Sequence, residues 1–186
     1  MLADVVSNQG VCKDLCSSTR RYPETFPQAS LVHFHFPARG DLPPVRLTWY
    51  DGGLKPPRPD QLEGDRRLGE EGLLFVGDRG AILCGFNGRR PQLLPAAKMR
   101  AFKQPPKTLP RSPGNEREWL DACAGGKGRP GANFEFSGAV TEALLLGNVA
   151  LRTGERLVWD RASLKAAEVP SAAPYIRPKR REGWAL

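Results

Sequence analysis

The sequence has few cysteines, few histidines and no long apolar run. Its 186 residues include two histidines and four scattered cysteines, at Cys12, Cys16, Cys84 and Cys123. No second Cys or His pair lies near Cys12 and Cys16 to complete a four-ligand zinc site, so we expect reduced thiols and no bound metal. No segment approaches the roughly 20 apolar residues of a membrane helix, and the first fifteen residues do not resemble a secretory signal. We therefore expect a soluble, cytoplasmic protein with no membrane contact.

Acidic residues are fewer than basic residues. The chain has 28 Lys and Arg against 20 Asp and Glu, a formal net charge of +8, which raises nucleic acid as a partner. The basic residues are spread along the chain, however, and their local concentrations at residues 89–90 and 179–181 have no aromatic-rich reading motif beside them. We interpret them as solvated surface, which argues against a nucleic-acid partner.

Two segments alternate apolar and polar residues with the period of a β-strand. They cover residues 29–36 and 45–50, separated by a turn-rich stretch, so we expect them to pair. One face of the pair would be apolar, with Val32, Phe34, Phe36, Val45, Leu47 and Trp49. The other would carry His33, His35, Arg46, Thr48 and Tyr50. Such a sheet is covered by helices on one side only.

Further strands are predicted in the middle of the chain. Residues 52–72 form a long loop with a helical turn near residues 59–62, because they are rich in Gly, Pro and charge. A hairpin follows, with strands at 73–76 and 81–84, in which Gly77 and Gly80 supply positive φ angles. Short strands are expected near 92–95 and 99–102.

Two helices and a C-terminal strap complete the prediction. Asn115 and Glu118 have the spacing of a capping box, so a helix should run to about Ala124. A second helix from Ser137 to Arg152 is apolar nearly all round, which predicts burial on more than one side against the covered sheet face. A last short strand is predicted at 157–159, and the prolines after Glu168 favour an extended strap. The predicted fold class is α+β, with a mainly antiparallel open sheet and helices packed on one face.

Four phrases stand in a particular order along the chain. They are Phe36-Pro37-Ala38-Arg39-Gly40, Leu47-Thr48-Trp49-Tyr50-Asp51-Gly52-Gly53, Trp119-Leu120-Asp121-Ala122-Cys123 and residues 145–154. In that order they resemble the C-terminal domain of the Gfo/Idh/MocA family of NAD(P)-dependent oxidoreductases. The likeness covers residues 15–186, with 15–169 as the α+β domain and 170–186 as its strap, and residues 1–14 are unmatched.

The resemblance implies that the cofactor site lies elsewhere. In the family, NAD(P) is bound by an N-terminal Rossmann domain, which also holds the catalytic lysine in a Glu-Lys-Pro motif. That motif is absent here, and neither His33 nor His35 follows an Asp at the family's four-residue spacing. A G-x-G-x-x-G match at 126–131 follows a predicted helix instead of a strand, so we interpret it as an interhelix loop. We assign no catalytic residue and expect the chain alone to bind no cofactor and to show no dehydrogenase activity.

The end of the second strand is the candidate substrate site. There Trp49, Tyr50 and Asp51 enter the long loop, where an aromatic face and a carboxylate can contact a sugar. Arg39, on the neighbouring loop, is added to this set. The alternative is that Trp49 belongs to the core and Asp51 starts a turn.

The expected role is to shape the pocket for a carbohydrate-like substrate in a sugar or inositol-type oxidoreductase. We expect a homo-oligomer through the open sheet face, with a separate Rossmann domain as a further partner. The chain can then be a gene fragment, the product of a late start or one half of a split enzyme. The alternative function is a non-catalytic carbohydrate- or protein-binding assembly module.

Overall fold

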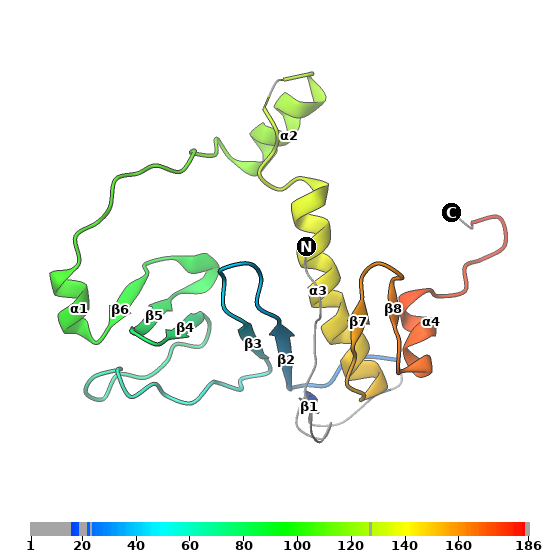
Figure 1. The fold of residues 1–186 in the computed structure, drawn as a ribbon, viewed down its shortest axis with the longest axis horizontal. Coiled ribbons are helices and arrows are strands. Elements are labelled where there is room, and N and C mark those ends of the chain that lie inside the picture. The colour runs from blue at the N-terminus through cyan, green and yellow to red at the C-terminus, as the bar shows by residue number, and fades with distance from the viewer. Residues whose placement is uncertain (1–15, 19–21, 23, 127, 185–186) are drawn as a thin grey trace. The chain divides into compact units, whose positions relative to one another are not determined.

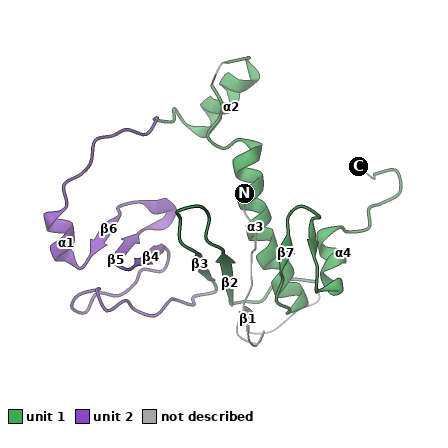
Figure 2. Ribbon diagram, in the orientation of Figure 1, with its two compact units in different colours: residues 1–52, 111–186 green, residues 53–110 purple. Residues whose placement is uncertain are grey.

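The structure is a computed structural model that describes residues 16–18, 22, 24–126 and 128–184. The chain divides into two compact units, residues 1–52 with 111–186 and residues 53–110 (Figure 2). Short antiparallel sheets and helices build both, so the fold class is α+β, as predicted (Figure 1). The described strands form three separate small sheets instead of one large open sheet, and each unit has its own hydrophobic cluster.

The sheet of the first unit follows the predicted alternation. Its antiparallel strands lie in the order β1 (Cys16–Ser18), β2 (Ser30–Phe36) and β3 (Val45–Tyr50). In the register of β2 and β3, Val32 lies opposite Trp49 and His33 lies opposite Thr48. Because directly opposite residues share a face, the predicted apolar and polar faces are confirmed.

Helix α3 (Phe134–Thr153) has well-defined ends. It begins before the predicted Ser137, because the Oδ1 atom of Asn133 accepts a hydrogen bond from the N–H of Phe136 at 3.1 Å and caps the helix. It ends as predicted at Gly154, whose φ of 68° is left-handed. Both boundaries are therefore set by local side-chain and backbone chemistry.

The core of the first unit forms where α3 meets β2 and the C-terminal segment. Gly147 permits this approach, because a Cβ there would lie 2.7 Å from the Cζ atom of Phe34. The buried members of the core are Val32, Phe34, Ala143, Leu146, Val149, Ala150, Leu157, Trp159, Val169 and Ala172. The expected packing of α3 on the apolar sheet face is confirmed for β2, while Val45, Leu47 and Trp49 of β3 on that face are exposed.

The first half of α3 does not meet that expectation. Its large apolar side chains are exposed, namely Phe134, Phe136, Val140, Leu144 and Leu145. The prediction of burial on more than one side is wrong for this half, because the core contacts begin at Ala143. Contrary to the expectation from the sequence, α3 is long and apolar enough, by length and composition alone, to cross a membrane. The packing of its second half against β2 is that of a core helix.

The segment after α3 packs into the core. It contains β7 (Trp159–Asp160), β8 (Lys165–Ala166), the 3₁₀ helix η2 (Pro170–Ala172) and α4 (Ala173–Ile176). Val169 and Ala172 are buried, so the predicted strap is wrong for residues 170–176. The prolines favoured helical turns instead, because they stand in the first turn, where a missing N–H needs no partner.

Helix α2 (Asn115–Cys123) has the predicted extent but a different cap. Gly114 occupies the N-cap and no side chain caps the helix, so the predicted capping box is wrong. The Glu118 carboxylate instead accepts the N–H of Gly131 at 2.7 Å, across the interhelix loop. The apolar stripe of Trp119, Leu120 and Cys123 is exposed.

The second unit is a small sheet with one short helix. Its elements are β4 (Leu73–Gly77), β5 (Gly80–Cys84), the 3₁₀ helix η1 (Phe86–Gly88), β6 (Gln92–Leu94) and α1 (Ala96–Ala101). Leu62, Ala81 and Leu94 form its buried cluster. The predicted hairpin is confirmed, although Gly80 alone of its two glycines has a positive φ, of 144°. The predicted strand at 99–102 is wrong, because Ala, Lys, Met and Arg at 96–101 are strong helix formers.

Candidate functional site

A hydrogen-bond network joins the end of β3 to the start of β2. The Asp51 carboxylate accepts the N–H of Ser30 at 2.5 Å through Oδ1 and the Ser30 hydroxyl at 2.7 Å through Oδ2. Oδ2 also accepts the Nε1–H of Trp49 at 3.2 Å. The carboxylate therefore positions the Trp49 indole and holds the two strand ends together.

Trp49 is a half-exposed aromatic platform. It lies on the apolar face of β3, but 52% of its surface is exposed. Trp49 is therefore not a core residue, contrary to the alternative interpretation of the sequence. The turn after Asp51 depends on Gly52, whose φ is 63° and whose Cβ position would lie 2.2 Å from the Gln28 carbonyl oxygen. Only glycine fits there. The position of Asp51 therefore depends on a turn that a side chain at residue 52 would block.

The other two predicted site residues lie apart from this network. Tyr50 lies opposite Leu31 on the polar face, the reverse side of the sheet from Trp49. Arg39 lies in the loop that joins β2 to β3, where its backbone N–H and C=O pair with Leu42 at 3.0 Å each. The length of β3 separates this loop from Asp51 by roughly 20 Å. The structure brings Trp49 and Asp51 together but not all four residues.

The polar face of the same sheet carries two histidines beside an arginine. The Nδ1 atom of His33 shares a hydrogen bond of 2.9 Å with the Thr48 hydroxyl, and His35 lies opposite Arg46. Burial, followed by the positive charge of Arg46, lowers the pKa of both His33 and His35 below 6.5. Each imidazole is therefore neutral near pH 7, and further protonation is opposed by the neighbouring guanidinium.

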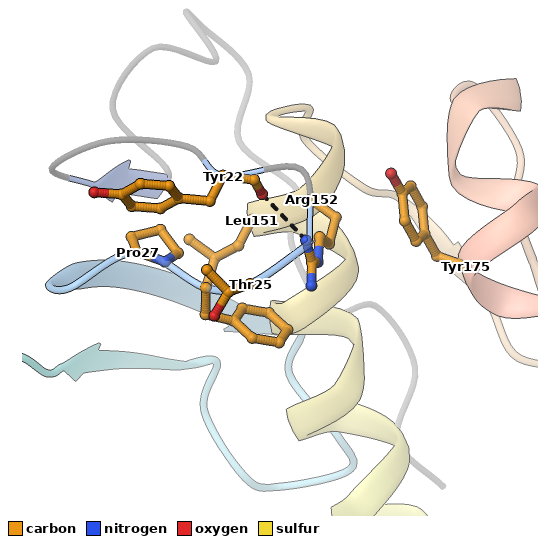
Figure 3. A pocket seen from close by; sticks show the side chains of 7 residues that line it. Tyr22, Thr25, Pro27, Leu151, Arg152 and Tyr175 are labelled. Carbon is orange, nitrogen blue, oxygen red and sulfur yellow. Dashed lines mark hydrogen bonds between the residues drawn. The ribbon is translucent and has the colours of Figure 1, made fainter.

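A cavity of about 280 Å³ lies in the same unit (Figure 3). It is lined by Tyr22, Thr25, Phe26, Pro27, Leu151, Arg152 and Tyr175. The Nη1 atom of Arg152 donates to the Tyr22 carbonyl at 3.2 Å, and its Cζ atom lies 4.4 Å from the centre of the Phe26 ring. The cavity therefore combines a fixed guanidinium with aromatic walls.

Sequence reasoning missed this cavity because its parts are far apart along the chain. Arg152 carried only the signal of a cation at a helix C-terminus, which is the usual structural role of such a residue. Tyr175 fell in the predicted strap. Only the packing of α4 near the end of α3 brings them to one place.

The described residues hold no group of three or more His, Cys, Asp or Glu that can bind a metal ion. Cys84 and Cys123 are free thiols, as predicted, while Cys12 and the side chain of Cys16 lie outside the described residues. Gly126 and Gly131 lie in the loop between α2 and α3, which confirms the predicted place of the G-x-G-x-x-G match. The match does not follow a strand, so it lacks the setting of a dinucleotide site.

In comparisons with known proteins, no family model and no curated protein matches the chain.

Proposed function

We propose that the chain is the substrate-pocket and oligomerisation domain of an NAD(P)-dependent oxidoreductase that acts on a sugar or inositol-type substrate. The order of the four phrases that resemble the Gfo/Idh/MocA family supports this class. The α+β fold supports it too, because β2 packs one face on a helix and presents histidines on the other. The resemblance assigns NAD(P) and the catalytic lysine to a Rossmann domain, so this chain alone is inactive.

The observation that carries the substrate class is the Trp49–Asp51 network. A sugar ring stacks its C–H groups on an exposed aromatic face, and the indole of Trp49 offers such a face. Asp51 is a positioning residue, since its oxygens accept hydrogen bonds from Ser30 and from the indole N–H. Because Asp51 already holds the Trp49 indole in place, the indole loses little conformational freedom when a ligand binds.

Tryptophan fluorescence during titration with myo-inositol and glucose tests this proposal. We expect saturable quenching that disappears in the Trp49→Phe variant. Trp119→Phe is the matched control, because this second indole is also exposed, at 65%, but lies on α2. Loss of quenching in the control variant alone, or the absence of saturable quenching in the unmodified chain, would contradict a sugar site at Trp49.

Calorimetric titration with NADH and NADPH tests whether this chain binds the cofactor or leaves that role to a separate Rossmann domain. We expect no binding, because the Gly-rich loop lacks its strand. Saturable binding at micromolar concentrations that is lost in Gly126→Ala and Gly128→Ala variants would show that the chain holds the cofactor itself.

A non-catalytic assembly module is the second candidate. The large exposed apolar side chains on α2 and on the first half of α3 favour it, since apolar surface left exposed to this extent marks contact sites. Sequencing the DNA directly upstream separates the two. A coding segment for a Rossmann fingerprint and a Glu-Lys-Pro motif would favour the oxidoreductase, and a complete unrelated neighbour would favour the module.

A further inference from the structure

Basic side chains cluster around His35 in the first unit. His33 and His35 lie two residues apart on β2, so their side chains point to the same side of the sheet, roughly 7 Å apart along the strand. Arg46 lies directly opposite His35 on β3. Arg156, in the segment after α3, lies near enough to act on His35 electrostatically. These four residues, the basic cluster, come from three separate parts of the chain.

The neighbouring charges in the basic cluster are all positive. Burial, followed by the charge of Arg46, lowers the pKa of both imidazoles, and Arg156 adds to this effect at His35. Neither Arg46 nor Arg156 forms an ion pair with a carboxylate in the part of the chain that the structure describes. The fold therefore holds two guanidinium groups near one imidazole without an ion-pair partner for either.

One donor in the basic cluster is buried and unused. The Nε atom of Arg156 is shielded from solvent, and it has no hydrogen-bond partner among the described residues. A buried N–H without an acceptor is costly, and such groups in native proteins usually bond to protein, water or a ligand. The hydrogen bond between the Nδ1 atom of His33 and the Thr48 hydroxyl leaves the Nε2 atom of that ring for a ligand. The basic cluster thus offers several polar groups to one acceptor.

A phosphate dianion complements these groups better than a carboxylate does. At pH 7 the two arginines carry two positive charges, whereas the two imidazoles are neutral because their pKa values are lowered. A phosphate group carries nearly two negative charges and offers at least three oxygens that point in different directions. These oxygens suit donors from β2, β3 and the segment after α3. A carboxylate carries one charge on two oxygens in one plane, and a neutral sugar carries none.

We propose that the basic cluster binds a phosphate dianion, either the free ion or the phosphate group of a small monoester, with its oxygens on Arg46, Arg156 and His35. The cluster lies on the reverse side of the sheet from Trp49, and the proposal does not rest on the oxidoreductase function. The proposed homo-oligomer uses the same polar face. A dianion bound there reduces the repulsion between the basic clusters of two copies.

Calorimetry on the full chain at pH 7 and low ionic strength tests the proposal, with inorganic phosphate and glycerol 3-phosphate as probes. We expect saturable binding with a dissociation constant on the order of 0.1–1 mM. Acetate should bind at least about tenfold more weakly, because it carries a single charge. Tighter binding of glycerol 3-phosphate would assign the site to a monoester, and tighter binding of inorganic phosphate would assign it to the free ion; either result supports the proposal.

NMR titration of the imidazoles locates the bound ion. The chain has two histidines, so the His33→Gln variant assigns both ring signals. Phosphate should raise the pKa of His35, because a neighbouring anion favours the charged imidazolium. An unchanged His35 pKa at saturating phosphate would overturn the proposal.

Arginine variants separate the basic cluster from the general positive charge of the chain. Arg46→Gln and Arg156→Gln should each weaken phosphate binding by about tenfold or more. Arg177→Gln removes the same charge just after α4, outside the cluster, and should leave binding unchanged. Because Arg46 is exposed, its variant tests the site even if the Arg156 variant fails to fold. Equal losses in Arg46→Gln and Arg177→Gln would contradict a specific site, as would the absence of saturable binding below about 10 mM.

Discussion

The Asp51 carboxylate accepts two hydrogen bonds from Ser30, one from its backbone N–H and one from its hydroxyl. Ser30 is only 2% exposed, and it is the one buried polar residue among the described residues. The pair therefore satisfies donors that water cannot reach, and it does so at the junction of β2, β3 and the long loop.

Replacing Asp51 with Ala should reduce the free energy of unfolding by about 2 kcal/mol, because it leaves both Ser30 donors buried without an acceptor. Asp78→Ala is the matched control, since this carboxylate is 92% exposed and its ion pair with Arg79 lies in solvent. We expect the control to change stability by less than about 0.5 kcal/mol. Urea denaturation measures both, and equal midpoints for the two variants would show that the Ser30 network is not stabilising.

Gly147→Ala should destabilise the first unit by about 1–3 kcal/mol, because the new methyl group would press on the Phe34 ring and overpack the core. Gly138→Ala is the control within the same helix. Its added Cβ meets nothing within 4 Å, so the better helix propensity of Ala should raise stability by about 0.5–1 kcal/mol. Thermal unfolding followed by circular dichroism decides, and a Gly147→Ala variant as stable as the unmodified chain would place α3 farther from β2.

Placing Glu at both Thr48 and Tyr50 should dissociate the proposed homo-oligomer, because an interface on the polar face would bury these unpaired charges. Thr108→Glu adds a charge at an exposed position outside the sheet and should have no effect. Light scattering at tens of micromolar gives the mass. A monomeric unmodified chain, or an oligomer that tolerates the double variant, would exclude this face as the contact surface.

Acid should destabilise the fold through His33 and His35. The unfolded chain binds protons at these residues near pH 6.5, whereas burial and Arg46 lower both pKa values in the folded state. Between the two pKa values the unfolded state holds more protons, so stability is full above about pH 6.5 and falls as the pH falls through the folded values. Protonation of these two histidines should therefore weaken the proposed homo-oligomer only below the ordinary histidine pKa of 6.5.

Urea midpoints between pH 5 and 7.5 check this pH dependence. The double variant with Gln at both histidines should flatten the profile in that range, where ordinary carboxylates have already lost their protons. An unmodified chain with a flat profile would show that the histidines are as solvated in the folded state as in the unfolded one.

The sequence by itself determined the features that arise from local chemistry. Period-two alternation predicted β2, β3 and their two faces, because successive side chains in a strand point to opposite sides. Gly154 predicted the end of α3, since a left-handed residue terminates a helix at low cost. The hairpin around residues 78–79 followed from the same kind of signal. The proposed enzyme class and the sugar remain predictions.

Only the tertiary structure decided what depends on distant partners. The chain after Glu168 folds back because Val169 and Ala172 find burial against α3, a gain that proline spacing does not reveal. Glu118 bonds to Gly131 instead of capping its own helix. The hydrogen bond between Arg152 and Tyr22 joins residues 130 positions apart. No local pattern encodes such a contact, because it forms only when tertiary packing brings the last turn of α3 next to Tyr22.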